Sequence, residues 1–322
     1  MKKILLMALS GIILITLCLT SSCKKDDDTN DDFVNPQVDG IRVTIPRAIV
    51  NDGKLSIFIS VTDLMGVPIK GLNKNNITLT RRTNGNTENI DLFNFNTGQG
   101  GSTPIKAGLA MDYSGSMYFD STFVPSMENA VKTFINLKNA TDEMEIIKFD
   151  NNVVVVQPFT ADSSLLHAAV DSAIQLGGST ALYEACLTAL DNANQAVANL
   201  PNFLPAVVAF TDGVNNRPPH NPDTVVASAM QMQIPVYTIG FGGIPTYQPD
   251  TTTLQMIADS TGGRFFWTPN ATDINQLYQY VSNQLSNSYI VTTPWNNKGY
   301  STLTVTVNYQ GFTATATRRV YH

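Results

Sequence analysis

Short apolar runs alternate with amphipathic segments between Ile105 and Trp267, and this alternation constrains the fold more than any other feature of the sequence. Strand-length apolar runs that alternate with stripes at helical spacing are typical of an α/β domain with a mostly parallel sheet. The runs predict strands at Ile105–Met111, Met144–Phe149, Val153–Val156, Ala206–Phe210, Val236–Ile239 and Phe265–Trp267.

Three segments between these runs carry apolar residues at helical spacing, which predicts helices that pack on the sheet. A similar pattern from Ile274 to Leu285 predicts a last helix. Cys186 shares a predicted buried face, so an inert thiol is favoured over a reactive one. Met230 and Met232 are also expected in the core. The stripes comprise Met127, Ala130, Val131, Phe134 and Ile135, then Leu166, Ala169, Val170, Ala173 and Ile174, then Leu182, Ala185, Cys186 and Ala189.

The segments on either side of this region have the pattern of β-structure. Residues 34–103 contain alternating apolar residues separated by Asn, Gly and Pro turns. Residues 288–322 predict a β-hairpin that turns at Gln310-Gly311. Strand sets on both sides of the α/β region suggest one β-sandwich built from two discontinuous segments, although two separate sheets would give the same pattern. We therefore expect an α/β domain at residues 104–287, flanked by a β-sandwich-like region.

The first residues have the pattern of an export signal. Lys2 and Lys3 precede an apolar run from Ile4 to Leu19, which is marginal in length for a membrane-spanning helix. The run ends in Leu19-Thr20-Ser21-Ser22-Cys23, and small residues before a cysteine resemble the lipobox at which bacteria cleave the chain and attach lipid. We expect a signal peptide at residues 1–22 and lipid on Cys23. The alternative is an ordinary signal peptide with an incidental cysteine.

Residues 23–33 begin at the expected lipid site and are rich in charge. The sequence Lys24-Lys25-Asp26-Asp27-Asp28 buries no apolar area, which predicts a solvated tether. It also resembles an acidic surface-export signal of some Gram-negative lipoproteins, although any lipoprotein has a polar tether. We expect a protein of the bacterial cell envelope, anchored by lipid in the outer membrane. The acidic signal would place it at the cell surface.

Charge and cysteine content argue against two classes of site. The 322 residues include 26 Asp and Glu against 20 Lys and Arg, a net charge of −6, which argues against nucleic acid as a partner. Removal of the leader would take away Cys18, and lipid would occupy Cys23. Cys186 is then the single free thiol, so neither a disulfide framework nor a zinc-type cysteine cluster is expected.

Three motifs in the α/β region carry a family resemblance. Asp112-Tyr113-Ser114-Gly115-Ser116 follows the first strand and matches the Asp-x-Ser-x-Ser motif of von Willebrand factor type A (VWA) and integrin I domains. Gly177-Gly178-Ser179-Thr180-Ala181-Leu182-Tyr183 resembles the family's Gly-Gly-Thr-Ala-Leu-Tyr loop with one inserted Ser, and Thr211-Asp212-Gly213 matches its Thr-Asp-Gly. The ordered set covers about residues 103–287 and is far more specific than any single motif.

The resemblance implies a doubly wound, mostly parallel sheet with helices on both faces and a metal-ion-dependent adhesion site. Its members would be Asp112, Ser114, Ser116, Thr180 and Asp212, with the hydroxyls as direct ligands and the aspartates acting partly through water. Loops at the carboxyl ends of parallel strands converge on one crevice, so the two carboxylates can meet. This all-oxygen set suits Mg²⁺, Mn²⁺ or Ca²⁺ and disfavours zinc or copper. Taken one by one, the same residues would serve as helix caps and a turn.

The resemblance implies a binding module and no enzyme. Neutral hydroxyl ligands leave the cation with affinity for an outside anion, so we expect a protein or glycan partner that supplies a carboxylate. The alternative is a structural scaffold of an envelope complex without metal-dependent exchange. Ser114 is outside any Gly-x-Ser-x-Gly elbow, and His167 and His220 lie in a helix pattern and a Pro-rich loop, which argues against a hydrolase triad. The sequence carries no signal for an oligomeric state.

Overall fold

The computed structural model describes residues 38–64, 66–92, 94–96, 104–173, 178–198, 200, 203–213, 215–241, 250–267, 288–296 and 298–321. The expected leader, the lipid site Cys23, the acidic tether and the expected last helix from Ile274 to Leu285 lie outside these residues, as does Gly177. Within the described part, no helix has the length and apolar character needed to cross a membrane.

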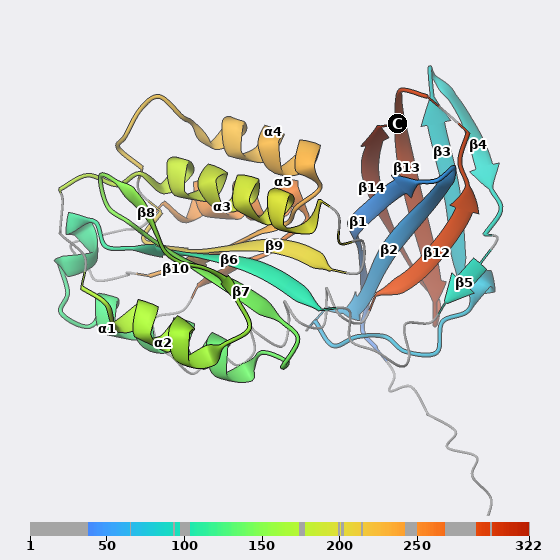
Figure 1. Cartoon of the computed structure of the whole chain (residues 1–322). Helices are drawn as coiled ribbons and strands as arrows, with labels where there is room; N and C mark the ends of the chain where they lie inside the picture. Colours follow the sequence, from blue (N-terminus) through green and yellow to red (C-terminus); the bar gives the residue numbers. More distant parts are fainter. Residues whose placement is uncertain are drawn as a thin grey trace, which may run out of the picture. The chain divides into compact units, whose positions relative to one another are not determined.

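A six-stranded sheet forms the centre of the α/β region (Figure 1). Its strands lie in the order β11-β10-β9-β6-β7-β8, and only β8, at one edge, runs antiparallel to its neighbour. The central strands β6 and β9 are buried along their whole length, as expected for a sheet covered on both faces. The bounds are β6 Ile105–Asp112, β7 Glu143–Phe149, β8 Val153–Thr160, β9 Leu204–Thr211, β10 Val236–Gly240 and β11 Phe265–Trp267.

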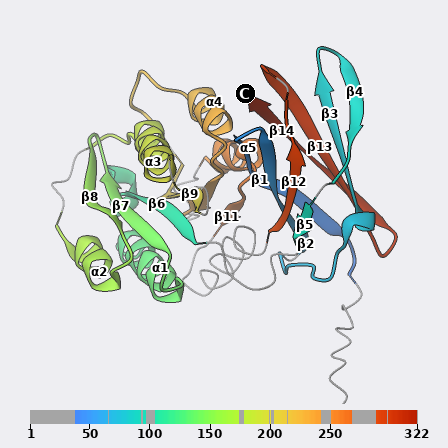
Figure 2. The same ribbon diagram turned by 45° about the vertical axis from the view of Figure 1, so that its right-hand side comes forward.

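Helices cover both faces of this sheet, as Figures 1 and 2 show. Leu109 and Ile146 face the core shared with α1 and α2, whereas Ala110 and Ile147 face the core shared with α3, α4 and α5. Alternate residues of one strand thus pack into the two cores on opposite faces of the sheet. The expected doubly wound α/β fold is confirmed. The bounds are α1 Phe123–Leu137, α2 Ser163–Asp171, α3 Leu182–Val197, α4 Pro222–Met232 and α5 Thr251–Thr261.

Three details differ from the sequence expectation. Strand β8 continues to Thr160, four residues beyond the apolar run that predicts it. Helix α2 ends at Asp171, so Ala173 is outside the helix that its spacing predicts. The expectation that Met230 is a core residue is wrong, because its side chain is 48% exposed on α4. Met232 does pack against the core beneath α3, α4 and α5.

Two four-stranded antiparallel sheets make up the β-rich flank, and each combines strands from both ends of the chain. One has the order β1-β2-β12-β5, and the other β14-β13-β3-β4. Their alternate residues meet in one apolar core that includes Leu55, Leu79 and Val305. The bounds are β1 Ile41–Asn51, β2 Lys54–Asp63, β3 Ile77–Thr83, β4 Asn86–Ile90, β5 Asn94–Asn96, β12 Tyr289–Pro294, β13 Tyr300–Tyr309 and β14 Phe312–Tyr321.

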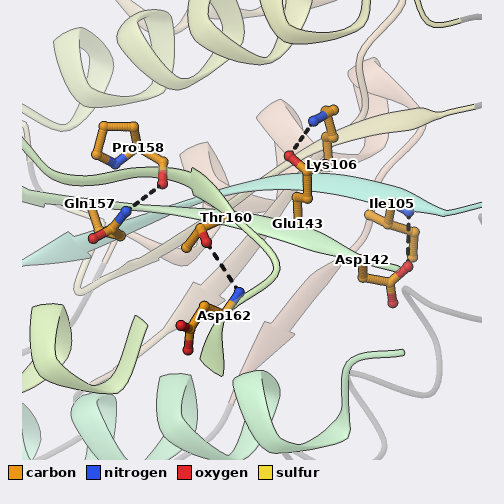
Figure 3. A network of polar contacts seen from close by, with 8 residues as sticks. All are labelled: Ile105, Lys106, Asp142, Glu143, Gln157, Pro158, Thr160 and Asp162. Carbon is orange, nitrogen blue, oxygen red and sulfur yellow. Dashed lines mark hydrogen bonds and ion pairs between the residues drawn. The ribbon is translucent and has the colours of Figure 1, made fainter. Parts of the chain in front are cut away.

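Polar side chains brace the amino ends of the parallel strands (Figure 3). Lys106, near the start of β6, forms an ion pair with Glu143 at the start of β7. The carboxylate of Asp142 accepts a 3.0 Å hydrogen bond from the Ile105 backbone N–H. These contacts fix the register of β6 against β7 at the amino ends of the strands. The motif residues lie at the opposite, carboxyl ends.

Candidate metal site

The Asp-x-Ser-x-Ser segment begins on the last residue of β6. Asp112 is fully buried there, and its Oδ1 accepts a 2.8 Å hydrogen bond from the Ser114 backbone N–H. The chain then enters a short 3₁₀ helix, η2 Gly115–Tyr118. This turn brings the Ser114 and Ser116 hydroxyl oxygens within 3.2 Å of each other. One carboxylate and two hydroxyls therefore gather at the carboxyl end of one strand.

Asp212 enters the same site from the neighbouring strand β9. The Thr211 hydroxyl donates a 2.6 Å hydrogen bond to Oδ2 of Asp112, which ties together the ends of β6 and β9. Asp212 is also fully buried. Gly213 then turns the chain with a φ of 87°, and a Cβ at this position would lie 2.9 Å from the Asp250 carbonyl oxygen. Glycine is required at position 213 because only glycine tolerates both the conformation and the close approach.

Thr180 reaches the site on the loop before α3. Its backbone N–H donates a 2.7 Å hydrogen bond to the Asn216 side-chain oxygen, and the Asn216 N–H donates back to the Thr180 carbonyl at 3.2 Å. A Cβ on Gly115 would lie 3.7 Å from the Gly178 carbonyl oxygen, so this loop lies directly beside the serine segment. The structure thus brings together the segments that carry all five expected residues.

Burial and mutual repulsion dominate the electrostatics of the site. Burial raises the pKa of Asp112 above its usual range, and the negative charge of Asp212 raises it further. Hydrogen bonds from Thr211 and Ser114 oppose this shift in pKa. Two buried carboxylates this close are unfavourable together, and a cation between them would remove both penalties.

The donor set fits a hard divalent cation. Adjacent ligands of an octahedral Mg²⁺ ion lie about 2.9 Å apart, given metal–oxygen distances of about 2.0–2.1 Å. The 3.2 Å separation of the Ser114 and Ser116 hydroxyls is close to this value. The described residues contain no cluster of three or more His, Cys, Asp or Glu, so a zinc-type ligand set finds no support there.

Residues 108–280, more than half of the chain, match the sequence model of the von Willebrand factor type A domain. The chain belongs to the von Willebrand factor type A family. Domains of this family are protein-interaction modules, and members bind divalent metals at the adhesion site. The search of curated proteins found no match to this sequence.

Solved structures of other VWA proteins are similar to this chain at low sequence identity. A von Willebrand factor type A protein from Catenulispora acidiphila is 12% identical, with a TM-score of 0.48, over 89% of this chain and 76% of that chain. Manganese-loaded TRAP from Plasmodium vivax is 15% identical, with a TM-score of 0.47, over 68% of this chain and 94% of that chain. Proximal thread matrix protein 1 from the mussel byssus, with a zinc-occupied adhesion motif, is 18% identical, with a TM-score of 0.48, over 61% of this chain and 48% of that chain.

Three residues of the VWA site have positioning roles that the sequence reasoning missed. Thr211 orients Asp112, as described above. Asn216 clamps the Thr180 backbone, and the Asp150 carbonyl accepts a 2.7 Å hydrogen bond from the Ala181 N–H. Thr211 is part of the Thr-Asp-Gly motif, so its hydroxyl, next to Asp212 in the sequence, could have been recognised as a candidate hydrogen-bond donor to the site. Asn216 and Asp150 belong to no recognised motif, and only the folded loops bring them to the backbone of Thr180 and of Ala181, respectively.

The remaining polar candidates lie outside the VWA site. Cys186 is fully buried, as predicted, and burial raises the pKa of its thiol to about 12, which favours an inert thiol. His167 is partly exposed on α2 and hydrogen-bonds Asn136 at 2.9 Å. His220 pairs with Glu184 at 2.7 Å, so neither histidine is presented to Ser114.

Proposed function

We propose that this VWA domain is a cation-dependent binding module. Ser114, Ser116 and Thr180 would hold Mg²⁺, Mn²⁺ or Ca²⁺ directly, while Asp112 and Asp212 would act partly through water. The observation that carries the proposal is the pair of buried carboxylates beside two hydroxyl oxygens 3.2 Å apart. The bound cation would supply an open coordination position for a carboxylate of a protein or glycan partner.

The hydrogen bonds around the site support the proposal that the cation binds a partner reversibly. Asp112 already accepts hydrogen bonds at both carboxylate oxygens, from Ser114 and Thr211, which restricts its role as a direct ligand. Three neutral hydroxyls would then make up most of the direct protein shell and leave the cation's charge poorly neutralised. A carboxylate from outside gains from this residual charge.

An exposed aromatic surface next to the site supports a macromolecular partner. Tyr118 ends η2 and is 45% exposed, and Phe119 follows it and is 66% exposed. Large aromatic side chains are enriched at the centres of protein interfaces. We infer that the partner places its carboxylate at the cation and packs an apolar group against Phe119.

We further propose that the protein acts at the bacterial cell envelope, anchored in the outer membrane by lipid on Cys23. The apolar leader and the small residues before Cys23 support this location. Cys23→Ser should abolish incorporation of labelled fatty acid and release the protein from the membrane fraction. Labelling that persists in the variant would contradict the proposal.

Two measurements test cation-dependent binding. Titration of the full-length protein with Mn²⁺, followed by calorimetry, should show one site per chain that is lost in Asp112→Ala. Envelope proteins captured in Mg²⁺ should then elute with EDTA. If Mn²⁺ binds and captured partners stay on in EDTA, the domain is a scaffold without metal-dependent exchange. If no Mn²⁺ binds, the proposed site is wrong.

A further inference from the structure

We propose that the β-sandwich carries a second binding site, which takes an acidic sugar unit in a pocket between Arg82, Arg319 and Tyr300. The pocket has a volume of about 380 Å³ and opens beside the β3–β4 turn at Asn84-Gly85. A pocket of this size lies at the lower end of the range for small-molecule sites. It belongs to the sheet β14-β13-β3-β4 and shares no residue with the proposed cation site.

Strand register places the two arginines on one face of the sheet. Thr302 on β13 lies directly opposite Arg82 on β3 and directly opposite Arg319 on β14. Opposed residues in antiparallel strands project to the same face, and so do residues two apart on one strand. Tyr300 therefore shares this face with Thr302. Arg82, Thr302, Arg319 and Tyr300 form one contiguous surface across three strands.

The alternate residues of these strands face the opposite way, which leaves this surface to solvent. Leu303 and Val305 of β13 are fully buried in the sandwich core, as is Leu79 of β3. Arg82 and Arg319 are exposed, and Tyr300 is 65% exposed. The surface thus combines two cationic groups and an aromatic ring, all within reach of a ligand.

The rim of the pocket is held in place by local structure. Asn84 and Gly85 have φ values of 51° and 87°, as in the tight turns that join two antiparallel strands. The Thr83 hydroxyl lies 2.8 Å from the Ser301 hydroxyl and ties this turn to the start of β13. The Arg319 guanidinium lies 5.4 Å from the centre of the Tyr300 ring, a cation–π contact that orients both groups.

Charge favours an anionic occupant. The protein has an excess of acidic residues, yet the two charged side chains that line this pocket, Arg82 and Arg319, are both basic. In the part of the chain that the structure describes, no carboxylate forms an ion pair with Arg82 or Arg319. The cross-strand neighbours of Arg82 are Thr87 and Thr302, which are uncharged. Both guanidinium groups are thus available to a ligand carboxylate, whose planar geometry they match.

The surroundings favour a sugar over an isolated ion. An exposed tyrosine ring presents an apolar face edged by a polar hydroxyl, which suits the flat face of a sugar ring. The next row on the same face consists of Thr80, Thr304 and Thr317, again directly opposed across the three strands. These hydroxyls continue the polar surface away from the pocket, where further sugar units of a chain could form hydrogen bonds. A free sulfate or phosphate would use only the arginines.

The test is calorimetric titration of the full-length protein with a linear trigalacturonate in EDTA. EDTA removes divalent cations, so the measurement does not depend on the proposed cation site. A failure to bind the sugar would therefore count against the sandwich pocket and not against the cation site. Binding should weaken as salt rises and should be absent for the methyl ester of the same trisaccharide, which keeps the rings and loses the charge. Arg82→Gln and Arg319→Gln should each weaken binding about tenfold, because each removes a charged hydrogen-bond donor.

Matched variants separate the pocket from general charge. Tyr300→Ala should weaken binding while Arg42→Gln, a change at an exposed arginine of β1, should leave it unchanged. Thermal melting of each variant verifies that the sandwich stays folded. Equal binding of the methyl ester, unchanged affinity in both pocket arginine variants, or no binding of trigalacturonate would overturn the proposal. Inorganic sulfate that binds as tightly as the sugar would also overturn it, because the pocket would then be a simple oxyanion site.

Discussion

The Thr211 hydroxyl donates a 2.6 Å hydrogen bond to Oδ2 of Asp112 and accepts a 3.0 Å bond from the Gly213 N–H. This one side chain therefore links the end of β6 to the turn that carries Asp212. The two carboxylates come from strands adjacent in space but about a hundred residues apart in sequence. Thr211 sets their relative position before any cation is bound.

Thr211→Val tests this positioning role. Valine has the same shape but no hydroxyl, so Asp112 and the Gly213 N–H each lose a buried partner. The free energy of unfolding should fall by about 1–3 kcal/mol, which denaturant titration measures. Mn²⁺ affinity should fall as well, because Asp112 is no longer held in place. Thr211→Ser keeps the hydroxyl and should recover most of the Mn²⁺ affinity, and equal affinity in the valine variant would contradict the role.

Removal of a carboxylate should abolish the stabilisation by cation. A ligand at a hundredfold excess over its Kd stabilises the folded state by about 2.7 kcal/mol, or about 5–10 °C in Tm for a domain of this size. Saturating Mg²⁺ or Mn²⁺ should raise the wild-type Tm accordingly. Asp112→Ala and Asp212→Ala should lose this rise, yet melt no lower than wild type in EDTA because the repulsion between buried carboxylates is gone.

The hydroxyl variants should give a graded response in the same assay. Ser114→Ala, Ser116→Ala and Thr180→Ala each remove one direct ligand and should reduce the rise in Tm without abolishing it. A full rise in Asp112→Ala would mean that the cation binds elsewhere in the protein.

Phe119→Ser tests the aromatic surface separately from the cation. The side chain is exposed beside η2, so its loss should leave the Mg²⁺-dependent rise in Tm unchanged. Capture of the partner that elutes in EDTA should fall about tenfold or more, as for an aromatic anchor at the centre of an interface. Val67→Ser, at a side chain that is 55% exposed in the loop after β2, is the matched control and should capture the partner normally. Equal capture by both variants would place the partner away from Phe119.

The sequence predicted the VWA fold because its signals are local. Apolar runs mark β6 and β9, and the motifs stand at their carboxyl ends, so the meeting of Asp112 and Asp212 follows from the parallel sheet alone. Helix α4 was not predicted, although its start carries a local signal, since Asn221 caps it and Pro222 occupies its first turn. The exposure of Met230 was missed because an apolar residue gives no sign of which helix face it occupies when the amphipathic pattern is weak.

The pairing of strands that are distant in sequence could not be predicted from such local signals. Strand β12 lies between β2 and β5, and its partners are more than 190 residues away in sequence. Its alternating Tyr289, Val291 and Thr293 indicate a strand, but many registers satisfy that pattern equally well. The pocket residues Arg82 and Arg319 are joined only by this kind of pairing through β13. No local motif could have placed them together.

Glu145 should make stability depend on pH. It is buried on β7, where the Asn192 side-chain N–H₂ lies 3.0 Å and 3.1 Å from its two carboxylate oxygens. Burial raises the pKa of Glu145 from 4.5 to about 7, and the bonds from Asn192 oppose this only in part. Because the folded state binds this proton more tightly, the associated stability is fully present below the unfolded pKa of 4.5 and is lost as pH rises through about 7.

Glu145→Gln removes the charge and keeps the shape, so its effect should change with pH. At pH 8 the variant should be more stable than wild type by about 1–3 kcal/mol, since the buried ionised carboxylate is gone and each unit of pKa shift corresponds to about 1.4 kcal/mol. The difference should shrink toward zero by pH 4.5. Urea unfolding of both proteins from pH 4.5 to 8 measures it, and Asp259→Asn, at an exposed carboxylate on α5, should show no such trend. A difference in unfolding free energy that is constant with pH would mean that Glu145 is ionised throughout the range.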